Sequence, residues 1–334
     1  MEKDKSSKRI FYFDIVRVIA MFLVIGVHAV GSIAPYAPEN AFSKGLAGVL
    51  DSLNSLGVPI FFALSGYFLL NQQIRDFLKW YKKHILHIII PFALYAIGYV
   101  VYFVGYEQHN PMMIPVAYVR GLLCNEIHPT HWFVYAIIGL YFATPPLSRM
   151  FQAMTDREVR IIYWGSISLF LFSFLLSRWG LSFAVNQFVF NATNLFAYIN
   201  GYCANRICHL RPFDFLSKYK WGFILVFLIG MQYYRDFSLF STLAVALLLI
   251  PPQNNNLHYP NIIKKVITLL SRHSYSIYLV HVAVLSFILI IHRDWTRGFN
   301  IKIFLLYPLV CAISLVLVLV PDYYIDKILK KLSG

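Results

Sequence analysis

The sequence predicts an all-α, polytopic membrane protein with about ten transmembrane helices, and three observations predict this class. Only 13% of the 334 residues are Asp, Glu, Lys or Arg, whereas a soluble domain carries roughly 25%. Apolar residues make up 59% of the chain, and they gather in runs long enough to cross hydrocarbon. Because one water-soluble core cannot hide this much apolar surface, we expect the chain to be embedded in a lipid bilayer.

Ten such runs follow one another along the chain, each close to the roughly 20 residues that span a bilayer. The seventh and eighth are the shortest, and the polar pair Arg235 and Asp236 separates them. No soluble domain is left over, so residues 1–334 are predicted to form a single transmembrane domain with its core at 11–323. The longest outer connection, 107–130, could fold back onto the membrane surface as a short re-entrant element. The predicted spans are 11–33, 50–70, 85–106, 131–149, 161–179, 189–205, 221–235, 238–252, 275–292 and 303–323.

The basic residues predict how these helices are oriented. Of the 29 Lys and Arg residues, 21 fall in segments on the side of the N-terminus, seven fall on the other side, and Arg17 lies within a span. This asymmetry places both termini in the cytoplasm and is typical of a multi-pass protein of the bacterial inner (cytoplasmic) membrane. The net charge of +14 does not indicate nucleic acid as a partner, because the basic residues form short clusters between apolar runs rather than one basic domain or arm.

Neither a metal site nor a disulfide framework is predicted. The four cysteines contain no CxxC pair, and the histidines do not form a ligand cluster with carboxylates in the sequence. We expect the cysteines to be small buried apolar residues. They are Cys124, Cys203, Cys208 and Cys311.

The first span carries three ionisable residues, Asp14, Arg17 and His28, although a charge near the bilayer centre costs roughly 2.5–3.5 kcal/mol on insertion scales. Asp14 and Arg17 are three residues apart and therefore neighbours on one helical face. His28 follows Arg17 by eleven positions, so its side chain lies within roughly 20° of the same helical face after a rise of about 16 Å. This polar stripe either faces a protein-lined passage, or it is a snorkelling arginine with a histidine near the outer headgroups.

Other polar residues lie at the ends of predicted spans or inside them. Ser65, Gly66 and Tyr67 follow Pro59, a sequence that allows a kink and the close approach of a ligand, or ordinary small-residue helix packing. A cationic patch precedes the third span, where it would meet anionic lipid or a phosphorylated ligand. This patch contains Lys82, Lys83, His84 and His87.

Two further pairs involve histidine. His131 and Trp132 open the fourth span, where a tryptophan is often an interface anchor. Tyr278 and His281 are three residues apart and share one face of the ninth span, as a structural pair or as part of a site.

Together these segments resemble the acyltransferase-3 family of membrane proteins, over nearly the whole chain. An Arg, ten residues and a His in the first helix match Arg17 and His28. The Phe-Phe-x-x-Ser-Gly-Tyr/Phe segment matches residues 61–67, and the His/Leu-Trp-Phe/Tyr opening of a middle helix matches residues 131–133. The late Ser-Tyr-x-x-Tyr-Leu-x-His signature matches residues 274–281. Each motif is weak alone, but their order and spacing make the resemblance specific.

The resemblance implies transfer of an acyl group, most often acetyl, from cytoplasmic acetyl-CoA to a hydroxyl of a carbohydrate acceptor, which is an extracytoplasmic or lipid-linked surface glycan. It implies that His28 acts as general base or carries the acyl group transiently, that Arg17 holds a CoA phosphate or carbonyl, and that Asp14 orients Arg17. The remaining predicted substrate-binding residues would line the cavity. They are Ser65, Gly66, Tyr67, His131, Trp132, Tyr278 and His281.

The chain departs from the family pattern at the start of the third span. Family members often carry an Arg-x-x-Arg pair there, and this chain has His84 and His87 at that spacing, beside Lys82 and Lys83. If that pair holds the phosphorylated donor, the lysines take over its role here.

Two other classes of function fit a polar stripe in a membrane protein. The first is a transporter or flippase of a glycan or acyl intermediate, and the second is a lipid-embedded binding or sensing protein. The fate of radiolabel from acetyl-CoA separates them, because only an enzyme places the label on the glycan.

Overall fold

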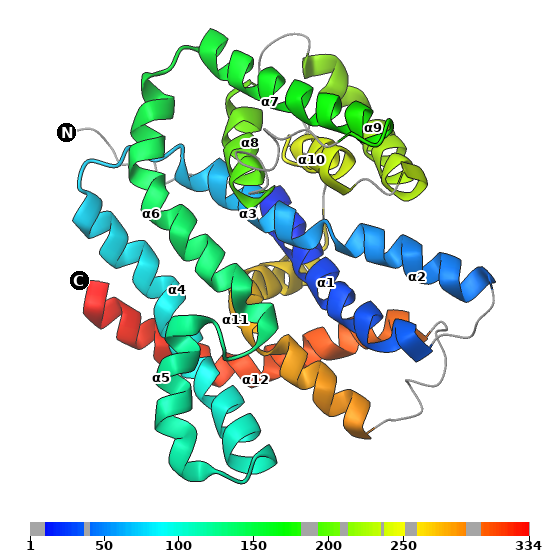
Figure 1. Ribbon diagram of the computed structural model, residues 1–334. Helices are drawn as coiled ribbons and strands as arrows, with labels where there is room; N and C mark the ends of the chain where they lie inside the picture. Colours follow the sequence, from blue (N-terminus) through cyan, green and yellow to red (C-terminus); the bar gives the residue numbers. More distant parts are fainter. Residues whose placement is uncertain are drawn as a thin grey trace.

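The computed structural model describes residues 11–36, 41–181, 193–207, 213–234, 237–250, 259–291 and 302–333, and this part of the chain contains helices and no strand (Figure 1). The α-helices are α1 (Phe11–Ile33), α2 (Ala41–Asn54), α3 (Gly57–Leu69), α4 (Phe77–Val100), α5 (Ile114–Cys124), α6 (Trp132–Ala153), α7 (Asp156–Ser177), α8 (Thr193–Ile207), α9 (Phe213–Tyr234), α10 (Phe237–Leu248), α11 (Asn261–Ile291) and α12 (Lys302–Ser333). The shorter helical turns are η1 (Ala34–Tyr36), the π-helical turn η2 (Val101–Glu107), η3 (Pro111–Met113) and η4 (Pro129–His131).

The all-α, multi-pass prediction is confirmed. Six stretches of the described residues are long and apolar enough to cross a membrane. A helix overlaps each of the ten predicted spans, while the number that cross the bilayer and the cytoplasmic location of both termini stay predictions. Parts of four predicted spans, the pair Arg235 and Asp236, and Cys208 lie outside the described residues. The six stretches are Phe11–Ile33, Phe42–Leu69, Phe77–Gly105, Asp156–Leu176, Asn261–Ile291 and Ile303–Leu332.

The second predicted span, 50–70, is not one continuous helix. The chain turns at Ser55 and Leu56, between α2 and α3. Pro59 explains the break, because it has no N–H to bond the carbonyl oxygen of Ser55 four residues earlier. In the structure Pro59 lies in the first turn of α3, where a proline needs no intrahelical partner. The predicted mid-span kink is therefore a helix boundary.

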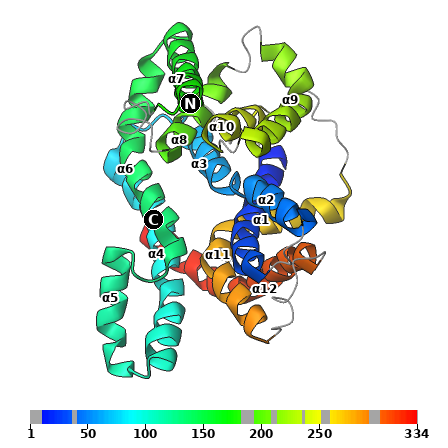
Figure 2. The same cartoon turned by 45° about the vertical axis from the view of Figure 1, so that its right-hand side comes forward.

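The outer connection 107–130 contains a helix of its own, α5, which packs along α4 (Figure 2). The Tyr118 hydroxyl donates to the Ala93 carbonyl at 2.9 Å and ties the two helices together. Asn125 ends α5 in the left-handed conformation, with φ 58°, which asparagine tolerates better than most residues. Helix α5 thus forms a helical hairpin with the C-terminal end of α4, and its placement relative to the membrane stays a prediction.

Helix α1 lies at the centre of the molecule, packed against α2, α3, α11 and α12 (Figure 1). It is the most buried of the six candidate spans. Polar residues on it therefore face protein rather than lipid, as the interior position of charged residues in membrane proteins requires.

A buried carboxylate holds α4, α11 and α12 together. Asp322 of α12 accepts hydrogen bonds from the Tyr95 hydroxyl at 2.8 Å and the Ser276 hydroxyl at 2.7 Å, and its other oxygen lies 2.5 Å from His273 Nδ1. A buried carboxylate is stable only when its oxygens are paired in this way. This network fixes the position of α11, which contributes to the site described below.

Helices α3 and α8 approach more closely than side chains normally allow. A Cβ atom on Gly66 would lie 1.7 Å from the Tyr198 carbonyl oxygen, and one on Gly201 would lie 1.9 Å from that of Ala63. Each helix thus presents a glycine to the backbone of the other, an arrangement typical of close packing in membranes. The contact holds the part of α3 that carries Ser65.

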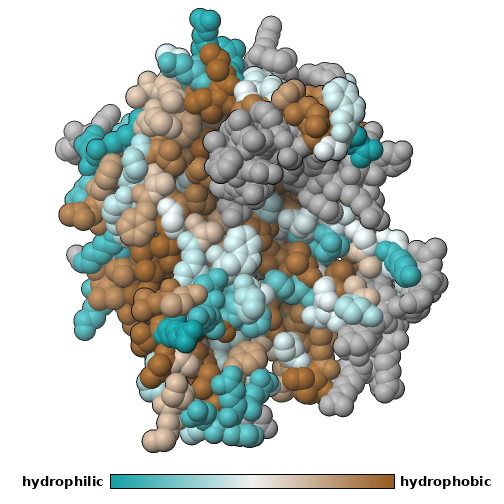
Figure 3. Space-filling view, in the orientation of Figure 1, coloured by the Kyte–Doolittle hydropathy of each residue, from teal (hydrophilic) through white to brown (hydrophobic). Residues whose placement is uncertain are grey.

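Large apolar side chains cover much of the surface in Figure 3. Such side chains are 59% exposed at Val226 and Ile229 of α9, and 68% and 66% exposed at Val316 and Val320 of α12. A soluble monomer rarely exposes contiguous apolar patches of this extent. We infer that hydrocarbon covers them.

Replacing Gly66 by Ala should lower the yield of folded protein and its thermal stability in detergent. The added Cβ has no room beside the Tyr198 backbone, and overpacking of this kind typically costs about 1–3 kcal/mol. Gly139→Ala is the matched control, because a Cβ there meets nothing within 4 Å. Equal thermal stability of the two variants would contradict the close α3–α8 contact.

Candidate active site

A cavity of about 370 Å³ lies between α1, α3, α4, α6 and α11, and we call it the central cavity. Each helix gives it one face, since the lining positions recur at helical spacing. On α6 these are Phe133, Ile137 and Tyr141, four residues apart. The lining residues are Arg17, Phe61, Ser65, Lys83, His84, His87, Ile88, Phe133, Ile137, Tyr141, Ser274, Tyr275 and Tyr278.

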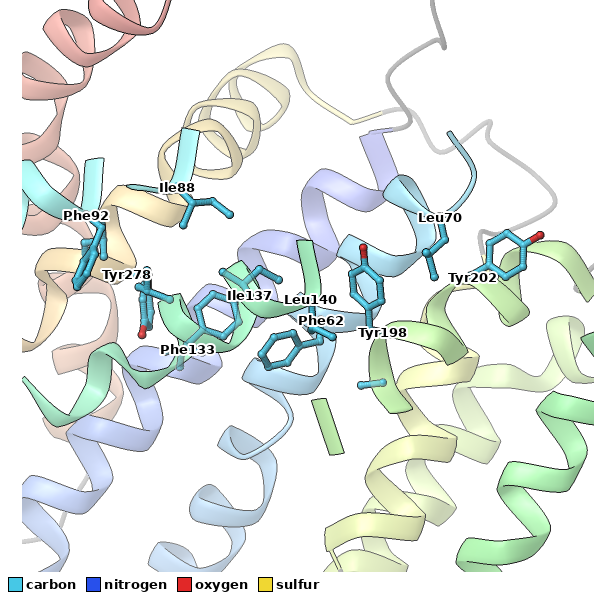
Figure 4. Packing of buried hydrophobic residues seen from close by; sticks show 14 of the residues in the cluster. Phe62, Leu70, Ile88, Phe92, Phe133, Ile137, Leu140, Tyr198, Tyr202 and Tyr278 are labelled. Carbon is cyan, nitrogen blue, oxygen red and sulfur yellow. The ribbon is translucent and has the colours of Figure 1, made fainter. Parts of the chain in front are cut away.

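Aromatic rings form one end of the central cavity, at Tyr278, and we call this end the inner end. Figure 4 shows Phe133 between Tyr278 and Phe62. The ring centroid of Phe133 lies 5.2 Å from that of Tyr278 and 4.9 Å from that of Phe62. The Tyr275 hydroxyl donates to the Ile88 carbonyl at 3.0 Å and joins α11 to α4. This wall is apolar toward the cavity and leaves few positions where a ligand can be bound by polar groups.

Arg17 enters the central cavity from α1 and is held by two partners. Its Nη1 lies 3.5 Å from Asp14 Oδ1 and donates to the Ser271 hydroxyl at 3.0 Å, while that hydroxyl donates to Asp14 at 2.7 Å. Asp14 is buried, and 31% of the Arg17 side chain remains exposed. The carboxylate compensates the guanidinium in a region of low dielectric, and the fixed charge can bind an anionic or carbonyl group in the cavity.

Three further residues of α4 form what we call the basic mouth of the central cavity: Lys83, His84 and His87. The His84 ring stacks on Trp80 at 4.1 Å, and its Nδ1 bonds the Trp80 carbonyl at 2.9 Å. His87 Nδ1 bonds the Lys83 carbonyl in the same way. Both rings are therefore held by their own helix through Nδ1, which leaves Nε2 available to a ligand.

A histidine cluster lies beyond the inner end of the central cavity, where His28, His128, His131 and His281 come together. The ring centroid of His281 lies 5.1 Å from His28 and 5.7 Å from Tyr278, which lines the cavity. His28, His128 and His131 all lie close enough to His281 to interact with it electrostatically. Residues from α1, α11 and the segment before α6, far apart in sequence, thus meet at one place.

Hydrogen bonds assign the tautomers of two of these rings. His281 Nδ1 lies 2.5 Å from the Tyr278 carbonyl oxygen, so Nδ1 carries the proton in the neutral ring and Nε2 is left as an acceptor. His131 Nε2 faces the Leu279 carbonyl oxygen at 3.4 Å, which leaves Nδ1 as the acceptor. Both acceptor nitrogens are buried without a protein partner in the described structure. Buried polar atoms of this kind are uncommon and often mark a functional site.

His128 lies at the outer edge of the cluster, in the loop before η4. Its Nδ1 accepts hydrogen bonds from the Thr130 hydroxyl at 2.8 Å and from the Thr130 backbone N–H. Burial lowers the pKa of His128 below its ordinary value, so the ring is neutral at pH 7. A neutral imidazole with Nδ1 occupied offers Nε2–H as a hydrogen-bond donor.

The structure brings most of the predicted site residues together. Arg17, Ser65, Lys83, His84, His87 and Tyr278 line the central cavity, Asp14 binds Arg17, and His28, His131 and His281 form the cluster at its inner end. Lys82 is exposed on α4 and does not line the cavity.

Three predicted substrate-binding residues lie elsewhere. Gly66 faces the Tyr198 backbone in the α3–α8 contact, because the small residue serves helix packing. The Tyr67 ring packs on Phe13 at 4.5 Å. Trp132 is 42% exposed at the start of α6, as an interface anchor would be. None of the three lines the central cavity.

Sequence reasoning did not assign a site role to Ser271, Tyr141 or His128. Tyr141 has a signal in the sequence, because it shares one helical face with Phe133 and Ile137. Ser271 and His128 have none, because Ser271 binds Asp14, more than 200 residues away, and His128 packs against Tyr99 of another element.

A family model described as an acyltransferase domain matches residues 10–322, nearly the whole chain. The chain belongs to the acyltransferase-3 family. No curated protein and no solved structure matches the chain.

The protein is therefore a membrane-embedded acyltransferase, and the family motifs can be located in its structure. Arg17 and His28 lie near opposite ends of the central helix α1. Ser274, Tyr275 and Tyr278 of the late signature line the central cavity, and His281 lies in the histidine cluster. Among the described residues of this acyltransferase, no group of three or more His, Cys, Asp or Glu side chains is arranged to hold a metal ion.

The predicted orientation of the acyltransferase can be checked by cysteine labelling. In a cysteine-free background, Lys83→Cys should react with a membrane-impermeant maleimide in inverted vesicles and not in intact cells, because the basic mouth opens toward the cytoplasm on the predicted topology. Met112→Cys, at a site 89% exposed in the outer connection, should behave in the opposite way. Labelling of both variants from the same side would contradict the orientation.

Proposed function

We propose that this acyltransferase transfers an acetyl group from cytoplasmic acetyl-CoA to a hydroxyl of an extracytoplasmic or lipid-linked glycan. One observation carries the proposal: the central cavity has a cationic end at Arg17 and the basic mouth, and its other end at Tyr278 abuts the histidine cluster. An enzyme that joins reactants from the two sides of a membrane needs such a route from a cation site to a group that can move a proton.

The acetyl-CoA donor would enter the central cavity with its pantetheine arm first. Its phosphates are bound at the basic mouth by Lys83 beside His87, with the exposed Lys82 close by in sequence, because an ammonium group pairs with phosphate. A volume of about 370 Å³ suits the slender pantetheine arm rather than the whole cofactor, so the nucleotide stays at the mouth. Arg17, fixed by Asp14 and Ser271, binds a polar group of the arm or the thioester carbonyl.

The reaction takes place at the histidine cluster. His28 accepts the proton of the acceptor hydroxyl while the oxygen attacks the thioester carbonyl carbon. A C–O bond forms, the C–S bond breaks, and the proton on His28 passes to the departing thiolate to give CoA–SH. His28 suits this role because it is half-buried on α1 beside a ring with an unused acceptor nitrogen.

His281 acts on His28 rather than on the substrate. Since its Nδ1 is committed to the Tyr278 carbonyl, its Nε2 can accept the N–H of His28 and orient that ring, as the third member of a catalytic triad orients its histidine. The ring separation of 5.1 Å is short enough for such a hydrogen bond between the two imidazoles. His281 is thus a positioning residue.

Replacing His28 by Ala should lower acetyl transfer to membrane glycan by a factor of about 10²–10⁴, the usual contribution of general acid–base catalysis. Arg17→Ala should cause a comparable loss, because the donor loses a fixed charge. The assay follows radiolabel from acetyl-CoA into glycan, in membranes with matched expression. His109→Asn, at an exposed histidine outside the site, is the control.

Retained glycan labelling in both variants would remove the catalytic assignment. Label that never reaches glycan in the unmodified protein would favour a transporter or a sensing protein instead. Label that remains on the quenched protein and depends on His28 would indicate the covalent route, in which His28 carries the acetyl group.

Replacing Lys83 or His87 by Ala should raise the KM for acetyl-CoA by about tenfold and change kcat little. A hydrogen bond to a charged group contributes roughly 1.5–3 kcal/mol, and solvent at the exposed mouth screens part of it. Lys331→Ala, in the last turn of α12, is the matched control for a lost surface charge. An unchanged KM in both variants would show that the basic mouth does not bind the donor.

A further inference from the structure

A second cavity of about 400 Å³ lies near the histidine cluster, between α4, η2, α11 and α12. We call it the lateral pocket, and its walls include Gly98, Tyr99, His128, Val280, Phe287 and Leu317. The α11 residues that line the lateral pocket follow those that line the central cavity, the last of which is Tyr278. The two cavities therefore follow one another along the same helix.

One thin wall separates the two cavities. Tyr278 lines the central cavity, and its hydroxyl donates to the Thr130 carbonyl at 2.5 Å. Tyr99 lines the lateral pocket; its ring lies 4.9 Å from that of His131, and its hydroxyl donates to the Leu279 carbonyl at 3.1 Å. His128 belongs to both the lateral pocket and the histidine cluster. A ligand in the lateral pocket would thus reach the cluster from the side opposite the donor.

The chemistry of the lateral pocket fits hydrocarbon with a polar group at one end. Its rim is apolar and open, with side chains 63% exposed at Phe287 and 54% exposed at Leu317. These residues lie within candidate membrane spans, so the opening faces lipid rather than water. His128, which offers a hydrogen-bond donor, lies on the wall shared with the cluster. Pockets that are mostly apolar with a few directed polar groups bind amphiphilic ligands.

The π-helical turn η2 contributes to this shape. It continues α4 over Val101–Glu107 and supplies Tyr102 and Phe103 to the pocket wall. Single π-helical turns inside α-helices are rare and occur often at functional sites.

We propose that the lateral pocket binds the hydrocarbon chain of a lipid-linked acceptor, and that the glycan attached to this chain enters the histidine cluster past His128. The inference rests on the proposed function and narrows it, because it selects a lipid-linked glycan over a soluble polysaccharide. The central cavity, with its cationic end, is assigned to the donor, and the lateral pocket is the route that remains for a substrate carried in the bilayer. Bulk lipid would fill the pocket equally well, but it would have no effect on the reaction.

The test fills the pocket without disturbing the fold. Gly98 lines the lateral pocket, and a Cβ added there meets nothing within 4 Å. Gly98→Leu should therefore fold and occupy part of the space for the chain. Gly165→Leu is the matched control, since Gly165 is also an exposed helical glycine with nothing within 4 Å, and it lies on α7 away from both cavities.

Membranes that contain each variant are incubated with radiolabelled acetyl-CoA, and the label is separated into material extracted by chloroform and methanol and material left in water. We expect label in lipid-extractable glycan with the unmodified protein and with Gly165→Leu. Gly98→Leu should reduce this label roughly tenfold, because displacing one or two methylene groups from an apolar pocket changes binding by about that factor. The KM for acetyl-CoA should be the same with and without the Gly98 substitution.

The outcomes separate the two proposals. No label in any glycan would overturn the proposed function itself. Label confined to water-soluble glycan, or unchanged lipid-extractable label in Gly98→Leu, would overturn the lipid-linked acceptor while leaving the acyltransferase reaction in place.

Discussion

The ion pair between Arg17 and the buried carboxylate of Asp14 is the constraint on which the rest of the structure depends. A guanidinium inside a membrane protein is stable only beside a counter-charge and with its hydrogen bonds satisfied. Asp14 supplies the charge from the same helix, and Ser271 of α11 bonds both groups. This three-residue contact fixes α1 against α11, the two helices that carry His28 and His281. The cation that can bind the donor and the imidazoles that can move the proton are therefore positioned by one interaction.

The arrangement of cavities follows from that helix pair. The central cavity opens beside Arg17 and ends at Tyr278, and the lateral pocket begins two residues further along α11, at Val280. The Asp322 network and the α3–α8 glycine contact hold the surrounding helices in place. Rigid helices on every side suit a reaction that depends on the alignment of two substrates, because positioned reactants react much faster than free ones.

Much of the site could be predicted from local spacing, since Arg17 and His28, Phe133 and Tyr141, or Ser274 and Tyr278 share faces that helical geometry dictates. Spacing cannot tell which small residue faces a ligand and which faces a neighbouring helix, so Gly66 was assigned to the cavity and lies against α8 instead. Hydropathy averaged over a span-length window also misses the break between α2 and α3, because the two helices together form one stretch that is apolar enough to cross a membrane. His128 could not be placed at all, because only tertiary packing brings its loop to the cluster.

The partition formed by Tyr278, Tyr99 and His131 bears on how easily protons leak across the membrane. On the predicted orientation, a merger of the central cavity with the lateral pocket would extend a water-accessible space from the cytoplasmic side deep into the bilayer and ease the passage of protons down the membrane potential. The hydroxyl protons of Tyr99 and Tyr278 are committed to backbone carbonyl oxygens in this partition, so they are not available to relay protons between the two cavities. If the donor and the acceptor occupy the two cavities as proposed, an acyl group can pass across this partition at a single point without opening a route for protons.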